Sequence, residues 1–281
     1  MKVSILVPAF NEEKTIGRVL QKLLALPIAD LEIIVIDDGS TDATGRVVQK
    51  WASDNPGIRS FVQPKNLGKT TAIARAISES TGEVLIVQDA DLEYDPNEIP
   101  EIISPIIEGV ADVVYGSRFL VKRASRVLYY YHYLANKCLT CLSNFLTNRN
   151  MSDIETCYKA FHRDVILPLN LRSRGFGMEV EITAMVCKTK ARTYEVPISY
   201  YGRTYEEGKK IGTWDGLAAI WYILYFNLIH PFTKSGRSYI KTVNKSLEER
   251  HSNWNSKGCG ESLETRSGDD RDPTSQRPRL S

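Results

Sequence analysis

The sequence has few of the features that point to a nucleic-acid-binding, secreted or membrane-spanning protein. Its 281 residues include 36 basic and 34 acidic side chains, a net charge of +2, so we expect no nucleic acid partner. No charged-then-apolar leader precedes the first strand pattern, so we expect no secretory signal. The five cysteines are an odd number, which favours reduced thiols and a cytoplasmic location. The longest apolar run, residues 217–226, is shorter than the roughly 20 residues that span a bilayer.

Motifs for metal, redox or phosphate-loop chemistry are also scarce. Cys138 and Cys141 form a C-x-x-C pair, but no second pair or histidine cluster completes a zinc site, so we interpret them as one helix face. No glycine-rich loop follows the first strand pattern, which argues against a P-loop or a dinucleotide fingerprint. The histidines fall in no recognised site pattern, and we expect them to be structural or exposed.

What is present is an alternation of strand and helix patterns. Apolar runs at 3–7, 31–36, 58–62, 83–87 and 112–115 predict strands, and helical patterns separate them. This predicts an α/β fold with a mostly parallel sheet flanked by helices, followed by a helical, amphipathic extension. We predict further helices at 126–146 and 178–188, and a strand at 192–198, in which Pro197 indicates either a sheet edge or the end of the strand. The expected domain covers residues 1–232, and the polar segment 233–281 is predicted to be a disordered tail.

Two carboxylates, Asp89 and Asp91, follow the strand pattern at 83–87. In open α/β sheets, ligands bind beyond the carboxyl ends of the strands. Hard oxygen ligands suit Mg²⁺ or Mn²⁺, which in turn hold a diphosphate. The sequence therefore predicts a metal and diphosphate site here. A solvated turn is the alternative, because Asp is a common turn residue.

Two further acidic turns follow the first and second strand patterns. Glu12 comes after the first, and Asp37 and Asp38 come after the second. Carboxylates at these positions suit hydrogen bonds from a base or a ribose. The alternative is helix capping, with Asn11 and Asp42 as the capping residues. Capping does not account for two adjacent aspartates.

Several motifs, taken in order, resemble a known family. Those of the first half resemble the family 2 glycosyltransferases of the GT-A fold: Pro8-Ala9-Phe10-Asn11-Glu12, Asp37-Asp38-Gly39-Ser40-Thr41-Asp42, Asn66-Leu67-Gly68-Lys69 and Asp89-Ala90-Asp91. Those of the second half resemble the dolichol-phosphate mannose synthase branch: Gly116-Ser117-Arg118-Phe119, Asp153 through Phe161, Gly175 through Glu179, Glu195 through Ile198 and Arg203 through Gly212. The resemblance covers about residues 3–230.

The resemblance implies roles for individual residues. Nucleotide-sugar binding would fall to residues after the first three strands: Pro8, Phe10, Glu12, Val35, Asp37, Asp38 and Lys69. The sugar, the diphosphate and a Mg²⁺ or Mn²⁺ ion would be held by Asp89, Ala90 and Asp91, with the two aspartates as the metal ligands. Phosphates would be clamped by Arg118, Arg203, Lys209 and Lys210, and Arg118 would join Asp89 and Asp91 as a catalytic group. Glycines around this second group, Gly202, Gly208 and Gly212, predict a loop that closes over the donor.

The implied activity is inverting transfer of a hexose, mannose from GDP-mannose, to a polyprenyl (dolichyl or undecaprenyl) phosphate. An acceptor phosphate is already anionic, so positioning matters more than a general base. Phe10, Thr70 and Glu93 stand where the branch often has Tyr, Gly and Gln, which leaves the donor open. The alternatives are a family 2 transferase that uses UDP-glucose or UDP-N-acetylhexosamine, and a non-catalytic sugar-nucleotide-binding protein. A nucleotidyltransferase would need a glycine-rich, arginine-containing loop after the first strand.

A lipid acceptor implies contact with a membrane. We expect a peripheral protein on the cytoplasmic face, with the membrane surface and a membrane-anchored subunit as partners. Residues 129–146 mix tyrosine with leucine, and residues 217–229 include Trp221, Tyr222 and Tyr225. Such aromatic residues favour the membrane interface. The alternative is that both segments pack against the sheet as core.

Overall fold

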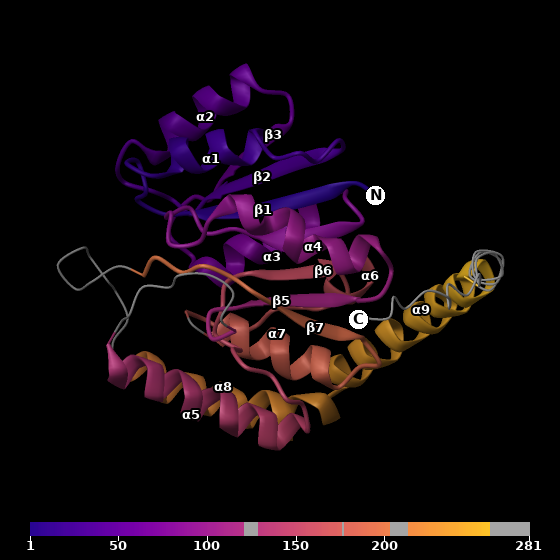
Figure 1. The fold of residues 1–281 in the computed structure, drawn as a ribbon. Coiled ribbons are helices and arrows are strands. Elements are labelled where there is room, and N and C mark those ends of the chain that lie inside the picture. Colours follow the sequence, from indigo (N-terminus) through magenta and orange to yellow (C-terminus); the bar gives the residue numbers. More distant parts are fainter. Residues whose placement is uncertain (121–128, 176, 203–212, 259–281) are drawn as a thin grey trace, which may run out of the picture.

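The computed structural model describes residues 1–120, 129–175, 177–202 and 213–258, and the side chains of 213–215 and 253–258 are not described. At its centre lies a seven-stranded sheet with the order β3-β2-β1-β4-β6-β5-β7 (Figure 1). The strands are β1 (Val3–Ala9), β2 (Leu31–Asp37), β3 (Ile58–Val62), β4 (Val84–Val87), β5 (Val113–Ser117), β6 (Lys159–His162) and β7 (Thr193–Pro197).

The sheet is mostly parallel, as the sequence predicts. β1 pairs in parallel with β2 and β4, with Leu6 opposite Ile34 on one side and Val87 on the other. β6 is antiparallel to both of its neighbours, β4 and β5. β7 is the edge strand next to β5, in agreement with the prediction from Pro197. The central strands are buried on both faces, which explains their continuous apolar runs.

Helices flank the sheet because their apolar side chains fall on one stripe. In α1 (Ile16–Leu24) the buried residues are Ile16, Val19, Leu20 and Leu23, the spacing of one helix face. The other helices that pack near the sheet are α2 (Thr44–Asp54), α3 (Lys69–Glu79), α4 (Ile99–Ile107), α6 (Arg163–Ile166) and α7 (Gly177–Cys187), and a short 3₁₀ turn, η1 (Pro96–Glu98), leads into α4.

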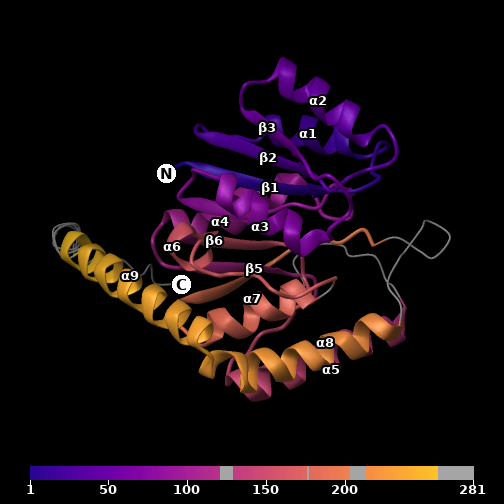
Figure 2. The ribbon, with the colours of Figure 1, turned by 180° about the vertical axis from the view of Figure 1, so that it is seen from behind.

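Two longer helices, α5 (Tyr130–Thr147) and α8 (Thr213–Leu228), lie side by side below the sheet (Figures 1 and 2). α8 also packs against α7, where Gly177 allows close approach. A Cβ at Gly177 would lie 2.5 Å from the ring of Tyr222. The Tyr222 hydroxyl also accepts the backbone N–H of Arg174 (3.2 Å). Tyr222 is therefore a packing residue of this interface.

The prediction of a disordered tail from residue 233 is wrong for the part that the structure describes. A 3₁₀ turn, η2 (His230–Phe232), leads into α9 (Lys234–Gly258), a helix of 25 residues. Its apolar residues are few but share one face, on which Tyr239, Val243 and Leu247 are buried. Near its end, Arg250 and His251 bond the buried carboxylate of Asp112, at 3.0 Å each. The polar average composition of residues 233–281 does not reveal this single apolar stripe. Residues 259–281 lie outside the described part.

Candidate active site

The carboxyl edge of β1, β2 and β4 brings the predicted acidic residues together. β1 lies between β2 and β4, so the strand order reverses at this point, which is where open α/β sheets bind ligands. Asp37 ends β2, and Asp89 and Asp91 come just after β4. Asp89 and Asp91 are both partly exposed, whereas Ala90 between them is buried. The Asp91 carboxylate accepts the backbone N–H of Glu93 (3.2 Å).

Lys69, the first residue of α3, lies beside Asp89. Its Nζ is 2.8 Å from Oδ1 of Asp89 and 3.2 Å from Oε1 of Glu179, a buried residue of α7. Burial alone would lower the pKa of Lys69, but the attraction of Asp89 and Glu179 raises it well above its usual value. Lys69 therefore keeps a positive charge at this edge across the physiological range.

The predicted ligand Asp38 has a structural role instead. It is buried, and its carboxylate accepts hydrogen bonds from Gln63 Nε2 (2.6 Å) and from the backbone N–H groups of Leu67 and Gly68 (both 2.8 Å). These bonds hold the turn that precedes α3, which in turn places Lys69. Asp38 therefore affects the site indirectly, by holding the backbone of the turn that positions Lys69.

Val35, which the resemblance implies in nucleotide binding, has a side chain that is buried within the sheet. It lies within β2 opposite Val7 and Ser60, and none of its surface is exposed. Both faces of a central strand are covered in this architecture, so only residues at or beyond the strand end reach the edge. Asp37 stands at the strand end; it too is buried, and its Oδ1 accepts the backbone N–H of Ser40 (3.0 Å).

The loop after β1 is tied to the loop after β2. The backbone N–H of Asn11 donates to Ser40 Oγ (3.0 Å), and the side-chain Oδ1 of Asn11 accepts the backbone N–H of Thr41 (2.8 Å). The Glu12 carboxylate accepts the hydroxyl of Thr15 (2.8 Å), and Glu12 is partly exposed, as are Pro8 and Phe10. Thr15 and Ala43 occupy the N-cap positions of α1 and α2, but the Asp42 carboxylate accepts the backbone N–H of Thr44, the first residue of α2 (2.9 Å). The ties fix the relative position of the two acidic loops.

Arg118, which follows β5, forms a two-pronged ion pair with Asp153. Its Nε and Nη2 lie 2.7 and 2.8 Å from the two carboxylate oxygens, and Asp153 is fully buried. Burial would raise the pKa of Asp153, but the Arg118 guanidinium holds it below its usual value. The guanidinium also lies over the ring of Tyr200 (5.2 Å). Asp153 therefore fixes the orientation of the Arg118 guanidinium and balances much of its charge.

Sequence reasoning missed an aromatic cluster beside these residues. The ring of Tyr94 lies 4.9 Å from that of Tyr158 and 5.3 Å from that of Tyr200. The Tyr158 hydroxyl donates to Gln88 Oε1 (2.6 Å), and the Tyr200 hydroxyl donates to Glu93 Oε2 (2.9 Å). Burial and then Glu93 raise the pKa of Tyr200. Glu93, one of the departures from the branch, thus has a defined hydrogen-bond partner.

Two acids were also missed. Glu155 and Glu179 each have one buried carboxylate oxygen that meets no hydrogen-bond partner within the described residues. Burial, followed by the charge of Glu179, raises the pKa of Glu155 to about 8. Both residues lie in motifs that carried the family resemblance, which is the signal that could have found them. They add acceptor oxygens for ligand hydroxyl groups.

The donor set suits a divalent ion only in part. Within the described residues, no group of three or more histidine, cysteine or acidic side chains could hold a metal. Asp89 and Asp91 supply hard oxygen ligands, and Mg²⁺ commonly binds one or two carboxylates and completes its shell with phosphates and water. The two aspartates therefore fit an ion that arrives with a diphosphate. The predicted clamp residues Arg203, Lys209 and Lys210 lie outside the described part.

The sheet order and the flanking helices are those of the GT-A fold. Residues 4–167 match the model of glycosyl transferase family 2, so the chain belongs to that family. It is 28% identical to a dolichol-phosphate mannosyltransferase of Pyrococcus furiosus, over 75% of this chain and 60% of that protein. It is 27% identical to an undecaprenyl-phosphate 4-deoxy-4-formamido-L-arabinose transferase of Proteus mirabilis, over 74% of this chain and 62% of that protein. These relatives agree with the branch that the motifs predicted.

Solved structures confirm the fold. Glucosyl-3-phosphoglycerate synthase of Mycobacterium tuberculosis, in complex with Mn²⁺, UDP and phosphoglyceric acid, superposes with a TM-score of 0.63 at 19% identity, over 81% of this chain and 79% of that one. Identity at that level speaks for the architecture alone. The chain spans about 60% of the length of the curated relatives that it matches.

Proposed function

We propose that this protein transfers a hexose, with inversion, from a nucleotide sugar to a polyprenyl phosphate. GDP-mannose is the first donor to test, and UDP-glucose and UDP-N-acetylhexosamine are the alternatives. The observation that carries the proposal is the acidic pair Asp89 and Asp91 beside cationic Lys69, at the point where the strand order reverses. The relatives named for lipid-phosphate sugar transfer support the acceptor class.

Asp89 and Asp91 would hold a Mg²⁺ or Mn²⁺ ion. When bound, such an ion neutralises the charge that develops on the departing diphosphate. Lys69 supplies a second positive charge at the same edge, fixed between Asp89 and Glu179. Phosphate oxygens offer Lys69 and Arg118 a further partner, and electrostatic stabilisation of this kind is commonly the largest single contribution to catalysis.

The remaining residues would bind and orient the donor and the acceptor. Glu12 and Asp37 present carboxylates at the ends of β1 and β2, where they suit a base or ribose. Arg203, Lys209 and Lys210 are proposed to clamp phosphates from outside the described part of the chain. The acceptor phosphate is anionic near neutral pH, so the site needs no general base and acts by positioning.

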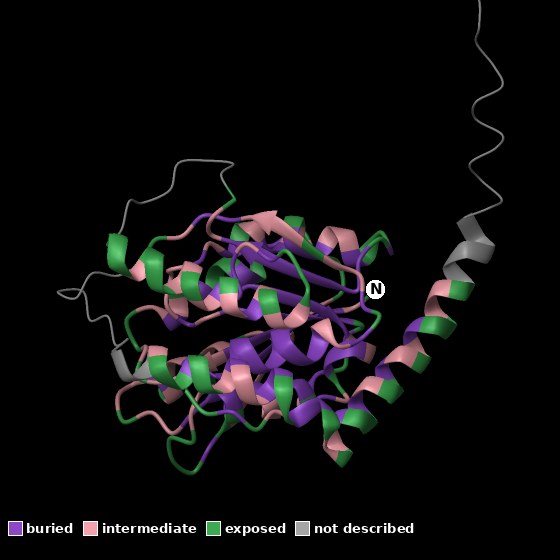
Figure 3. Ribbon diagram, turned by 90° about the horizontal axis from the view of Figure 1, so that it is seen from below, coloured by how far each residue is buried: buried purple, intermediate pink, exposed green. Residues whose placement is uncertain are grey.

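The face formed by α5 and α8 supports contact with a membrane. Large apolar side chains are exposed there, among them Tyr131 at 82%, Phe145 at 84% and Trp221 at 60%. Figure 3 shows exposed residues along the helices seen from below, with buried residues behind them. We call this surface the apolar face; its exposed members are Tyr130, Tyr131, Tyr133, Leu134, Phe145, Leu217, Ile220, Trp221, Leu228, Ile229 and Phe232.

A contiguous apolar surface of this kind marks a partner or a lipid interface. Within the described residues, no helix is both long and apolar enough to cross a bilayer. We therefore propose that the apolar face lies on the membrane without spanning it, on the cytoplasmic side. This would bring the lipid-linked acceptor to the protein that uses it.

The test is a transfer assay with purified full-length protein. GDP-mannose, UDP-glucose and UDP-N-acetylglucosamine are each supplied with a polyprenyl phosphate, with Mn²⁺ or with EDTA. We expect one donor to give a metal-dependent glycosyl lipid, with inverted anomeric configuration by NMR. Absence of product with every donor, while the protein still binds nucleotide, would support the non-catalytic alternative.

A further inference from the structure

The first half of α9 carries a row of positive charges on one face. Lys234, Arg237, Lys241 and Lys245 are all exposed, and their spacing of three, four and four residues places them on one side of the helix. The opposite side carries the buried residues Tyr239, Val243 and Leu247. The first acidic residue of α9 is Glu248, so Lys234, Arg237 and Lys241 all precede the acids of the helix, and of the four only Lys245 lies near one, Glu249 (4.0 Å). The helix is amphipathic with a basic outer face.

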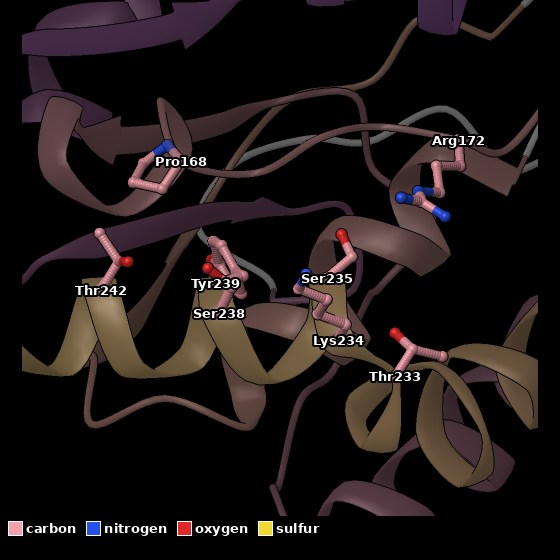
Figure 4. A pocket seen from close by; sticks show the side chains of 8 residues that line it. All are labelled: Pro168, Arg172, Thr233, Lys234, Ser235, Ser238, Tyr239 and Thr242. Atoms are coloured by element: carbon pink, nitrogen blue, oxygen red, sulfur yellow. The ribbon is translucent and has the colours of Figure 1, made fainter.

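A groove runs alongside the basic stripe (Figure 4). Its volume is about 570 Å³, and it separates the start of α9 from the loop that contains Pro168 and Arg172. Figure 4 shows the Arg172 side chain directed toward the α9 side of the groove, on which Lys234 and the hydroxyl residues stand. The eight residues that line the groove include no acid: Pro168, Arg172, Thr233, Lys234, Ser235, Ser238, Tyr239 and Thr242.

The wall that carries Arg172 is held in place from within. Both oxygens of the Glu181 carboxylate accept the backbone N–H of Arg172 (3.0 Å each), and one accepts that of Ser173 (2.8 Å). On the other wall, the Tyr239 hydroxyl donates to the carbonyl of Val165 (3.1 Å). The groove is therefore a built feature with cations and hydroxyl groups on fixed backbone.

The basic stripe continues directly from the apolar face. Leu228, Ile229 and Phe232 are exposed at 53%, 51% and 71%, and Lys234 follows within two residues. Exposed apolar side chains that lead into a row of cations suit a lipid leaflet, in which apolar acyl chains adjoin charged phosphates. Charge complementarity thus selects an anionic lipid surface as the occupant.

We propose that the basic stripe and its groove bind the headgroups of anionic phospholipids, and that they fix the orientation of the apolar face on the membrane. The inference deepens the proposed function, because it rests on membrane contact by that face. A single weak anchor gives only reversible binding, and an apolar anchor combined with a basic patch binds stably.

The test is vesicle flotation of the full-length protein. One vesicle is phosphatidylcholine alone, and the other contains 30% phosphatidylglycerol. The variant Lys234→Gln/Arg237→Gln/Lys241→Gln removes three charges from the stripe. The matched control, Arg18→Gln/Arg46→Gln/Lys50→Gln, removes three exposed charges from α1 and α2 on the far side of the sheet.

We expect the wild type to favour the anionic vesicles by about tenfold or more, because basic residues near an anionic membrane surface strengthen binding. The stripe variant should lose about tenfold of this partitioning, and the control should change by less than about twofold. Arg172→Gln should reduce it by a smaller factor. Salt at 0.5 M should abolish the preference, because it screens surface charge. Equal partitioning of the wild type onto both vesicles, or equal losses in both triple variants, would overturn the proposal.

Two further measurements separate this proposal from the proposed function. Sugar transfer to a detergent-dispersed polyprenyl phosphate should be unchanged in the stripe variant, because the stripe lies away from the acidic edge. If no protein transfers sugar, the transferase proposal fails while the vesicle result still decides the lipid proposal. A short RNA added as competitor tests the other polyanion class. Loss of RNA binding in the stripe variant without loss of vesicle binding would overturn the lipid assignment.

Discussion

Lys69 Nζ lies 2.8 Å from Oδ1 of Asp89, so the first acid of the predicted metal pair already has a cationic partner. Lys69 also contacts Glu179, which keeps the ammonium group at the edge when Asp89 takes another ligand. The site is therefore organised before a ligand arrives, and its charges are balanced in advance. Preorganised charges of this kind cost little rearrangement during the reaction.

Replacing Lys69 should weaken donor binding more than folding. Lys69→Met leaves Asp89 and Glu179 without their shared cation and removes a charge beside the diphosphate. We expect the Kd for nucleoside diphosphate, measured by calorimetry, to rise by about tenfold, which corresponds to about 1.4 kcal/mol. Lys22→Met, which removes a surface pair with Asp95, is the control and should bind normally. Unchanged affinity in Lys69→Met would exclude a role for Lys69 in binding the diphosphate.

Asp91→Asn should abolish transfer and leave the fold intact. The substitution keeps the size of the side chain and removes a hard anionic ligand, so turnover should fall by about 10²-fold or more. The rise in melting temperature produced by Mn²⁺ together with nucleoside diphosphate should disappear. Asp95→Asn, in the η1 cap, provides the matched acid-to-amide control. If Asp91→Asn retained metal-dependent turnover, Asp91 would not be a metal ligand that transfer requires.

The Arg118–Asp153 pair should be a large contribution to stability. Removing one partner of a buried pair typically costs about 3–5 kcal/mol, because the other charge is left uncompensated. We expect a loss of that order in urea unfolding for Asp153→Asn. Arg118→Met/Asp153→Asn together should lose less than the sum of the two single variants. Strict additivity would mean that the two groups act independently.

Glu32 provides a pH-dependent test at the opposite edge of the sheet. Burial would raise its pKa, but hydrogen bonds from Ser4, Thr81 and Lys2 lower it to about 2. A depressed carboxyl pKa gives stability that is complete above the unfolded value and is lost as pH falls. The wild-type melting temperature should therefore drop between about pH 4.5 and pH 2. Glu32→Gln should be less stable at pH 7 and should flatten this drop, and an identical pH profile would contradict the assignment.

Exposed and buried residues of α8 should separate membrane contact from packing. Trp221 is 60% exposed, whereas Ile223, two residues later, is fully buried. Trp221→Ser should reduce vesicle flotation and change the melting temperature by only a few degrees. Ile223→Ser should lower stability by several kcal/mol, because it places a hydroxyl in the core. If Trp221→Ser unfolds the protein as Ile223→Ser does, this part of α8 belongs to the core.

The acidic edge could be predicted because local patterns determine it. A buried apolar run ends before Asp89, and a similar run contains Asp37 at its end, so both acids had to reach one edge of a parallel sheet. The environments of Val35 and Asp38 could not be predicted in this way, because they depend on residues distant in sequence. Helices cover Val35, and the backbone N–H groups of Leu67 and Gly68 donate to the carboxylate of Asp38. α9 was missed for a similar reason, since a single buried apolar stripe and bonds to distant residues such as Asp112 reveal its packing.

The reversed direction of β6 has a consequence for how the protein reaches its native state. Because β6 runs against its neighbours, the segment before it arrives at the same edge that lies after β4, which is how Tyr158 meets Gln88 across 70 positions of sequence. β4 and β5 gain a common partner only when β6 inserts between them. A nascent chain that stops before β6 would leave β4 without a partner on one side and β5 without a partner on either side, and unpaired strand edges invite aggregation. Assembly of the acidic edge and protection of the sheet therefore depend on the same contacts, which are distant in sequence.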